Sequence, residues 1–243
     1  MDFVADWIKK RIGFIYAEHN SFQLELRLEK YILQNKLTSS SELIEIIKSM
    51  DRIEEQKFIE ILVNNETYFF REPKFYEDLK KKIIPRLLEG KISRHLKFCS
   101  LACSSGQEVY SVAFICEQLI AEGLAFTYEI LGTDISEPVL EKLKNGIYNK
   151  LEFDRGLNID DHGDYFEIEG ETFTINKKIR SKIDVMKLNL KDEFKLSCQY
   201  DMVLCRNVLY YLEKEVKQSL VIAAKKPSAL YSTILNGRNT IPL

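Results

Sequence analysis

The chain has 243 residues, of which 45% are hydrophobic and 30% are charged, and its formal net charge is −2. This length fits one large domain or two modest ones, with enough apolar surface to bury a core without disulfides. The near-neutral charge argues against a general nucleic-acid binder. The sequence has no run of 18 apolar residues and no signal-peptide pattern at its start, so we expect a cytoplasmic protein that is not inserted in a membrane.

The cysteines and histidines form no recognisable catalytic or metal-binding pattern. The five cysteines, at positions 99, 103, 116, 198 and 205, are odd in number and contain no CxxC pair. The three histidines, at positions 19, 95 and 162, lie far apart. We therefore expect neither a disulfide framework, nor a metal site, nor a histidine-based triad. Cys99, Cys103 and Cys205 lie in apolar runs and are predicted to be reduced core thiols.

Residues 1–64 are predicted to be helical throughout. Apolar residues recur at three- and four-residue spacing in residues 3–16, 21–36 and 41–50, and a fourth helix is predicted over residues 52–63. No Gly-rich or Pro-rich linker follows. These features predict an all-α N-terminal domain over residues 1–70.

The next segment, residues 71–97, is basic, with nine Lys and Arg against four Asp and Glu. Most of it is predicted to form one helix, residues 73–88, with Pro73 in the first turn, where a missing N–H costs least. Its charge is typical of a solvated helix face, and it would also suit a patch that meets an acidic partner.

Residues 98–243 alternate between strands and helices. Strands are predicted near residues 96–103, 127–135 and 199–208, and helices near 109–122, 136–149 and 213–224. This alternation predicts an α/β domain with a parallel sheet covered by helices. Residues 151–185 break the pattern and are predicted to form a small antiparallel insert.

Chemically suggestive residues follow the predicted strands, where ligands of open α/β sheets bind. The turn at residues 102–108 has small residues and a single Gly, so it lacks the dinucleotide pattern GxGxxG. Glu108 follows this turn and suits a cationic ligand such as S-adenosylmethionine, which carries an ammonium and a sulfonium. An ordinary turn between a strand and a helix is the alternative.

Three further features have two interpretations each. Asp134 ends the second strand and could bind the hydroxyls of a ribose or cap the next helix. Arg206 and Asn207 directly follow an apolar run, so they either bond backbone or face a ligand. The aromatic run at residues 65–72 could serve packing alone.

Together, four segments resemble the CheR-type chemotaxis receptor methyltransferases in order and spacing, over about residues 3–225. They are NETYFFRE (65–72), ACSSGQEVYSVA (102–113), GTDISEPVLEKLKNGIY (132–148) and CRNVLYYL (205–212). The resemblance implies a helical N-terminal domain, then a Rossmann-like S-adenosylmethionine domain with a small β-insert. It also implies methyl transfer to glutamate side chains on the cytoplasmic helices of chemoreceptors, without a metal, by a monomer that binds a receptor tail peptide at the insert in some members.

The resemblance also implies roles for individual residues in the site. The residues it places against S-adenosylmethionine are Asn65, Thr67, Arg71, Glu108, Asp134, Asn189, Leu190, Arg206 and Asn207. Among these, Glu108 would hold the methionine ammonium and Asp134 the ribose, while Asn189 and Leu190 would lie beside the adenine. Arg71 and Tyr211 would flank the methyl group and the acceptor carboxylate.

The sequence departs from the family pattern in two places. Gln107-Glu108-Val109 replaces Glu-Glu-Pro, which keeps the acid. After residue 224 the chain reads KKPSALYSTILNGRNTIPL, which leaves room for one strand, residues 230–235, so we expect a shortened sheet. Three alternatives stay open: a methyltransferase for another carboxylate, a diverged module that binds cofactor and partner without efficient catalysis, and, least favoured, an NAD-dependent oxidoreductase.

Overall fold

The structure is a computed structural model that describes residues 2–16, 21–192 and 200–224. The chain divides into two compact units. The first contains the described parts of Met1–Asn64, Asn189–Phe194 and Val208–Val221, and the second contains those of Asn65–Leu188, Lys195–Asn207 and Ile222–Leu243. The predicted domain borders at residues 70 and 97 stay predictions.

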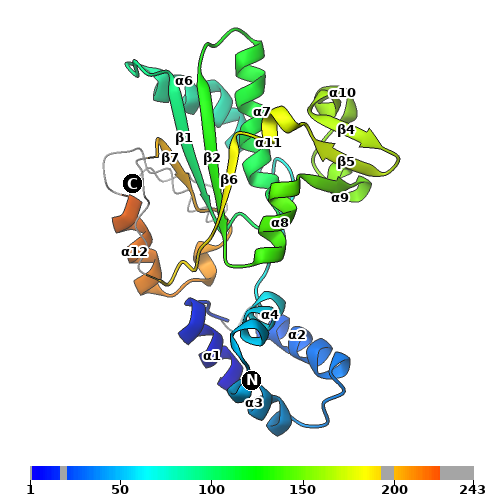
Figure 1. The fold of residues 1–243 in the computed structure, drawn as a ribbon. Helices are drawn as coiled ribbons and strands as arrows, with labels where there is room; N and C mark the ends of the chain where they lie inside the picture. Colours follow the sequence, from blue (N-terminus) through cyan, green and yellow to red (C-terminus); the bar gives the residue numbers. More distant parts are fainter. Residues whose placement is uncertain (1, 17–20, 193–199, 225–243) are drawn as a thin grey trace. The chain divides into compact units, whose positions relative to one another are not determined.

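The first unit consists mainly of helices (Figure 1). Its elements are α1 (Asp2–Ile12), α2 (Ser21–Gln34), α3 (Ser40–Ser49), α4 (Arg52–Leu62), a 3-10 turn (Leu209–Tyr211) and most of α12 (Lys214–Ala224). The four N-terminal helices expected from the periodicity are present. Their start signals act locally, because Ser39 Oγ accepts the Glu42 N–H and Asp51 forms a capping box with Glu54.

The predicted helix over residues 73–88 is continuous but not uniform. It consists of α5 (Pro73–Asp78), a π-helical turn (Leu79–Ile83) and α6 (Ile84–Leu88). Pro85 has no N–H for the carbonyl four residues earlier, and its ring clashes with that carbonyl, so the turn before it widens. Lys74 and Lys82 pair with Asp78, which fits a solvated helix face.

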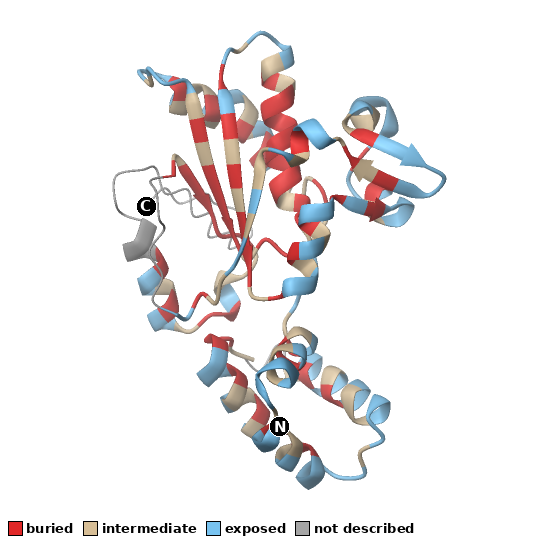
Figure 2. Cartoon of the chain, viewed as in Figure 1, coloured by how far each residue is buried: buried red, intermediate tan, exposed pale blue. Residues whose placement is uncertain are grey.

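A four-stranded parallel sheet is the centre of the second unit. The strand order is β6 (Ile183–Lys187), β2 (Thr127–Asp134), β1 (His95–Leu101) and β7 (Met202–Leu204). The register places Leu101 opposite Thr133, so the carboxyl ends of β1 and β2 lie side by side. The helix α7 (Gln107–Ala121) packs on β2, and α8 (Glu137–Asn145) packs on β2 and β6. Figure 2 shows α7 buried along most of its length.

The insert is an antiparallel sheet in the order β3 (Ile147–Asn149), β5 (Thr172–Ile175) and β4 (Phe166–Glu169). Its short helices are α9 (Lys150–Asp154), α10 (Ile159–His162) and α11 (Lys177–Arg180), and a 3-10 turn (Gly163–Tyr165) precedes β4.

The boundaries of the insert differ from the prediction at both ends. The preceding helix stops at Asn145, because Gly146 adopts a left-handed φ of 64° there, and the next three residues pair with β5. At the other end, Ile183–Lys187 joins the parallel sheet as β6. The strand predicted over residues 230–235 lies outside the described residues. Within the described ranges, no helix has the length and hydrophobicity needed to cross a membrane.

Candidate functional site

The turn after β1 has an unusual backbone held against the end of β2. Ala102, Ser104 and Gly106 all have positive φ values, of 53°, 52° and 90°. A Cβ on Gly106 would lie 2.3 Å from a methyl carbon of Leu143, so this position needs glycine on two grounds. The Cys103 N–H donates to the Thr133 carbonyl at 2.8 Å. Strained residues of this kind persist where the surroundings hold them, and they cluster at functional sites.

Asp134 is the side chain that joins the two strand ends. Its carboxylate is buried, with 5% of the residue exposed, and it accepts the Ser104 N–H at 2.8 Å and the Ser136 N–H at 3.0 Å. The bond to Ser136 anchors the residue before α8, but the N-cap is Ser136 and not, as the capping interpretation had expected, Asp134. The bond to Ser104 anchors the turn after β1, which the sequence did not indicate.

The junction segment, residues 65–72, is fixed to this turn and to α7. Ser104 Oγ donates to the Asn65 carbonyl at 2.8 Å, and the Phe70 N–H donates to Ser111 Oγ at 2.9 Å. The ring of Phe69 is fully buried among aromatic side chains of α7 and the insert. Packing therefore explains Phe69, but within the second unit, whereas the packing alternative expected a contact between the two halves of the chain. In the sequence, the polar residues of the junction segment lie before and after the buried Phe69.

Arg206 forms a buried ion-pair network with the junction segment and α7. Its Nη1 donates to Glu108 Oε2 at 2.9 Å, and its Nη2 donates to the Arg71 carbonyl at 2.7 Å and to Glu72 Oε2 at 3.0 Å. The guanidinium carbon lies 4.2 Å from the ring centre of Phe75. Burial alone would lower the pKa of Arg206, but the nearby Glu108 carboxylate and the other partners raise it above its ordinary value. Arg206 is therefore a permanent cation in this network.

This network refines the expectation that Arg206 and Asn207 line a pocket. Arg206 bonds the backbone of the junction segment, as one of the two interpretations allowed, and Asn207 donates to Glu72 Oε1 at 3.1 Å. Glu108 also accepts the hydroxyl of Ser100 at 2.8 Å. Direct bonds or shared partners thus join six of the predicted site residues in two groups. Ser104 links Asn65 and Asp134, and the Arg206 network links Arg71, Glu108, Arg206 and Asn207.

A second group of side chains surrounds Tyr68 on the exposed side of the junction segment. We call Glu66, Tyr68, Arg71 and Arg155 the outer cluster. Arg71 donates to the Glu66 carbonyl at 3.0 Å, and Arg155 Nη2 lies 2.5 Å from Glu66 Oε1. The guanidinium carbons of Arg155 and Arg71 lie 4.5 Å and 5.6 Å from the Tyr68 ring centre. The hydrogen bond from Arg155 lowers the pKa of Glu66. Thr67, which lies between Glu66 and Tyr68 in the sequence, is half-buried.

The remaining predicted site residues belong to the first unit. The Tyr211 hydroxyl accepts from Asn64 Nδ2 at 3.3 Å, and its ring stacks on Phe14 with centres 4.8 Å apart. Asn189 donates to the Arg11 carbonyl at 3.0 Å, and Leu190 is buried. The roles of Tyr211, Asn189 and Leu190 at the site stay predictions.

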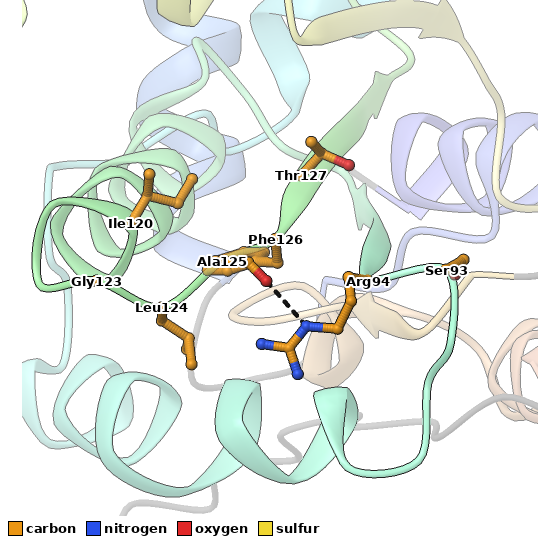
Figure 3. A pocket seen from close by; sticks show the side chains of 8 residues that line it. All are labelled: Ser93, Arg94, Ile120, Gly123, Leu124, Ala125, Phe126 and Thr127. Atoms are coloured by element: carbon orange, nitrogen blue, oxygen red, sulfur yellow. Dashed lines mark hydrogen bonds between the residues drawn. The ribbon is translucent and has the colours of Figure 1, made fainter.

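A surface hollow lies elsewhere, at the other end of the sheet (Figure 3). It has a volume of about 660 Å³ and is formed around the amino ends of β1 and β2, where Arg94 Nε donates to the Ala125 carbonyl at 2.8 Å. The site described above lies at the opposite ends of the same strands. Its small-residue turn and its two acids, Asp134 and Glu108, fit a ligand with a ribose and an ammonium. Among the described residues, no His, Cys, Asp and Glu group is suited to a metal.

The thiols near the site are buried. Cys103 and Cys205 are 3% and 4% exposed, as expected for core thiols, and burial raises the pKa of Cys205 to about 12. A thiol with so high a pKa is protonated at neutral pH and is a poor nucleophile. Nothing in this site therefore indicates cysteine chemistry.

A family profile and two relatives point to the same family. A family profile described as "CheR methyltransferase, SAM binding domain" matches residues 65–233. Chemotaxis protein methyltransferase 1 of Pseudomonas aeruginosa is 30% identical over 220 residues, which cover 89% of this chain and 80% of that protein. Chemotaxis protein methyltransferase Cher2 of Pseudomonas putida is 31% identical over 222 residues, with the same coverage of both chains. A TehB-like methyltransferase structure from Corynebacterium glutamicum gives a TM-score of 0.34 at 13% identity, covering 70% of this chain and 73% of that one.

Proposed function

Because the chain belongs to the CheR methyltransferase family, we propose that the junction segment and the carboxyl ends of β1, β2 and β7 form its catalytic site. The family assignment makes the chain an S-adenosylmethionine-dependent protein-glutamate methyltransferase that acts on chemoreceptors. The residues that carry out each part of the reaction are the subject of the proposal.

One observation supports this location above all. Asp134 joins the ends of β1 and β2, while Ser104 and Arg206 tie the junction segment to the same ends. Every one of these groups lies where ligands of open parallel sheets bind. Hydrogen bonds between protein groups thus hold the site together, and such organisation reduces the entropy cost of binding.

The acidic groups suit the two ends of the cofactor. Asp134 would hold the ribose, and Glu108 would interact with the methionine ammonium, with Asn65 and Thr67 contributing from the junction segment. When bound, S-adenosylmethionine supplies an electrophilic methyl group. Since Arg206 already pairs with Glu108, we assign Arg206 to holding that carboxylate in place.

The acceptor glutamate needs no general base. Its ordinary pKa is about 4.3, so at neutral pH the carboxylate is already the nucleophile. The protein's task is therefore to orient the carboxylate and exclude water, which is largely a proximity effect. Arg71 can orient it by paired N–H bonds, and Tyr211 would add one more hydrogen bond. The arginine must not bind the ground state too tightly, because that would give no gain in rate.

The partners follow from the reaction. We propose that the substrates are the cytoplasmic helices of chemoreceptors, so that the protein works in the cytoplasm as a monomer, without nucleic acid. The antiparallel insert is the proposed docking place for a receptor tail peptide. Two alternative functions would use the same site residues. They are methylation of another carboxylate, and binding of cofactor and partner without efficient turnover.

Calorimetric titration with S-adenosylhomocysteine tests the cofactor site. We expect saturable binding by the wild-type chain and a loss of affinity of about 10- to 100-fold in Asp134→Ala, because charged hydrogen bonds are worth about 1.5–3 kcal/mol. Asp184→Ala, which removes an exposed acid from the neighbouring strand β6, is the matched control and should bind normally. Normal binding by Asp134→Ala would contradict the proposed site, and binding without methyl transfer would favour a non-catalytic module.

A further inference from the structure

We propose that Arg155 binds a carboxylate of the protein substrate, and that Glu66 occupies this position until the substrate arrives. The inference rests on the proposed function, because it assigns a substrate contact next to Arg71. It makes Arg155 a specificity-determining residue for an acidic segment of the substrate. The geometry of the outer cluster supports this inference.

The backbone holds Arg155 close to the junction segment. The next residue, Gly156, has a φ of 133°, and a Cβ there would lie only 2.1 Å from the Phe69 carbonyl oxygen. This close approach requires glycine. The α9 end of the insert therefore touches the junction segment at Phe69, and Arg155 is positioned beside the outer cluster as a result.

The Arg155 side chain is held and yet accessible. Its guanidinium lies over the Tyr68 ring at 4.5 Å and reaches Glu66 Oε1 at 2.5 Å. The side chains of Arg155 and Glu66 are 52% and 51% exposed, so solvent and a partner can reach the pair. An exposed ion pair of this kind is worth only about 0.2–1 kcal/mol, which an incoming carboxylate can replace at little cost.

The same cluster contains Arg71, which is the residue proposed to orient the acceptor glutamate. Arg71 donates to the Glu66 carbonyl, and its guanidinium also lies against Tyr68. Two guanidinium groups thus lie against one aromatic ring, and Glu66 offers its carboxylate to Arg155 and its backbone carbonyl to Arg71. Arginine recognises carboxylates by planar, paired N–H bonds, so this arrangement fits a substrate segment with a second acid near its acceptor glutamate.

Steady-state methyl transfer to a chemoreceptor cytoplasmic fragment tests the inference. In Arg155→Gln we expect KM for the fragment to rise about two- to five-fold, with kcat and the affinity for S-adenosylhomocysteine unchanged. In Glu66→Gln we expect KM to fall, because the internal competitor is gone. Lys150→Gln, which removes an exposed cation from the same helix, is the matched control and should behave as wild type.

The opposite changes in KM expected for Arg155→Gln and Glu66→Gln distinguish substrate binding by Arg155 from a purely structural role. If the Glu66–Arg155 pair only fastened the insert to the junction segment, both variants would weaken methyl transfer in the same direction, and the inference would be overturned. A fragment whose other acids near the acceptor are changed to glutamine should abolish the difference between wild type and Arg155→Gln. If that difference persists, Arg155 does not read a substrate carboxylate.

Direct titration of the fragment keeps this inference distinct from the proposed function. A wild-type chain that binds the fragment but does not methylate it would overturn the proposed function, and the affinity of Arg155→Gln would still decide the role of Arg155. Methylation by all variants with an equal KM would overturn the inference alone. A wild-type chain that neither binds nor methylates the fragment would overturn both.

Discussion

Arg206 and Glu108 form an ion pair at 2.9 Å in which the arginine side chain is only 1% exposed. Family resemblance assigned both residues to the cofactor, yet in the structure each is first of all a partner of the other. The same guanidinium holds the Arg71 carbonyl and the Glu72 carboxylate. The position of the proposed carboxylate-orienting residue, Arg71, therefore depends on a charge network beneath it.

Replacement of Arg206 should lower the stability of the protein. Arg206→Ala leaves the carboxylates of Glu108 and Glu72 without their buried partner, and we expect the free energy of unfolding to fall by about 3–5 kcal/mol. Urea denaturation measures this loss. Arg86→Ala removes an exposed arginine from α6 and should change the stability by less than about 0.5 kcal/mol. Equal stability of the two variants would show that the network contributes nothing.

Replacement of Arg71 should separate chemistry from cofactor binding. In Arg71→Ala we expect kcat/KM to fall about 100-fold, because a misplaced carboxylate loses the benefit of proximity. S-adenosylhomocysteine should still bind, since Asp134 and Glu108 remain in place. Methyl-transfer assays and calorimetry on the same preparation measure the two effects. Full activity in Arg71→Ala would refute the orienting role.

The close approach at Gly156 should make that glycine more sensitive than another one in the insert. Gly156→Ala places a methyl group against the Phe69 carbonyl, and we expect it to cost about 2–4 kcal/mol of unfolding free energy. Gly170 also has a positive φ, of 60°, but no atom lies within 4 Å of a Cβ there. Gly170→Ala should therefore cost only about 1–2 kcal/mol, from the backbone alone. Chemical denaturation of both variants provides the comparison, and equal losses would argue against the contact.

His162 should make stability depend on pH below neutrality. Burial lowers the pKa of His162 from its ordinary value of 6.5, beside the rings of Phe70 and Phe114. The unfolded chain then takes up a proton first as the pH falls below 6.5, so this residue's contribution to stability is lost on acidification. Urea midpoints at pH 7.5 and 5.5 should differ less in His162→Gln than in wild type. An unchanged difference would show that other groups cause the pH dependence.

The sequence predicted most of the architecture because its signals were local. Helical periodicity predicted the N-terminal helices, and the alternation of apolar runs with helices predicted the parallel sheet. The three-residue strand β3 was too short to show a period of two, so residues 147–149 were predicted as the end of a helix. The π-helical turn before Pro85 was not predicted either, because periodicity over 16 residues hides one extra residue in a turn.

The sequence named candidate site residues, whose roles stay predictions, but it did not indicate their hydrogen bonds. Asp134 and Arg206 were identified by their places after strands, but their partners Ser104 and Glu72 were not, since hydrogen bonds between distant segments leave no local pattern. Ser111, which receives the Phe70 N–H, looked like any small residue on a helix. Arg155 belonged to a segment predicted only as part of an insert. A Gly directly after it was the one available signal of a close approach.

The anchoring of the junction segment determines where the chain can be divided into fragments. A fragment beginning at residue 71, just after the border predicted from composition, would discard the Asn65 carbonyl that Ser104 binds, the buried Phe69 ring and the Phe70 N–H that Ser111 accepts. A fragment beginning at Asn65 would keep all three. A fragment meant to keep the second unit intact must therefore include residues 65–70, which the sequence assigned to the preceding helical domain.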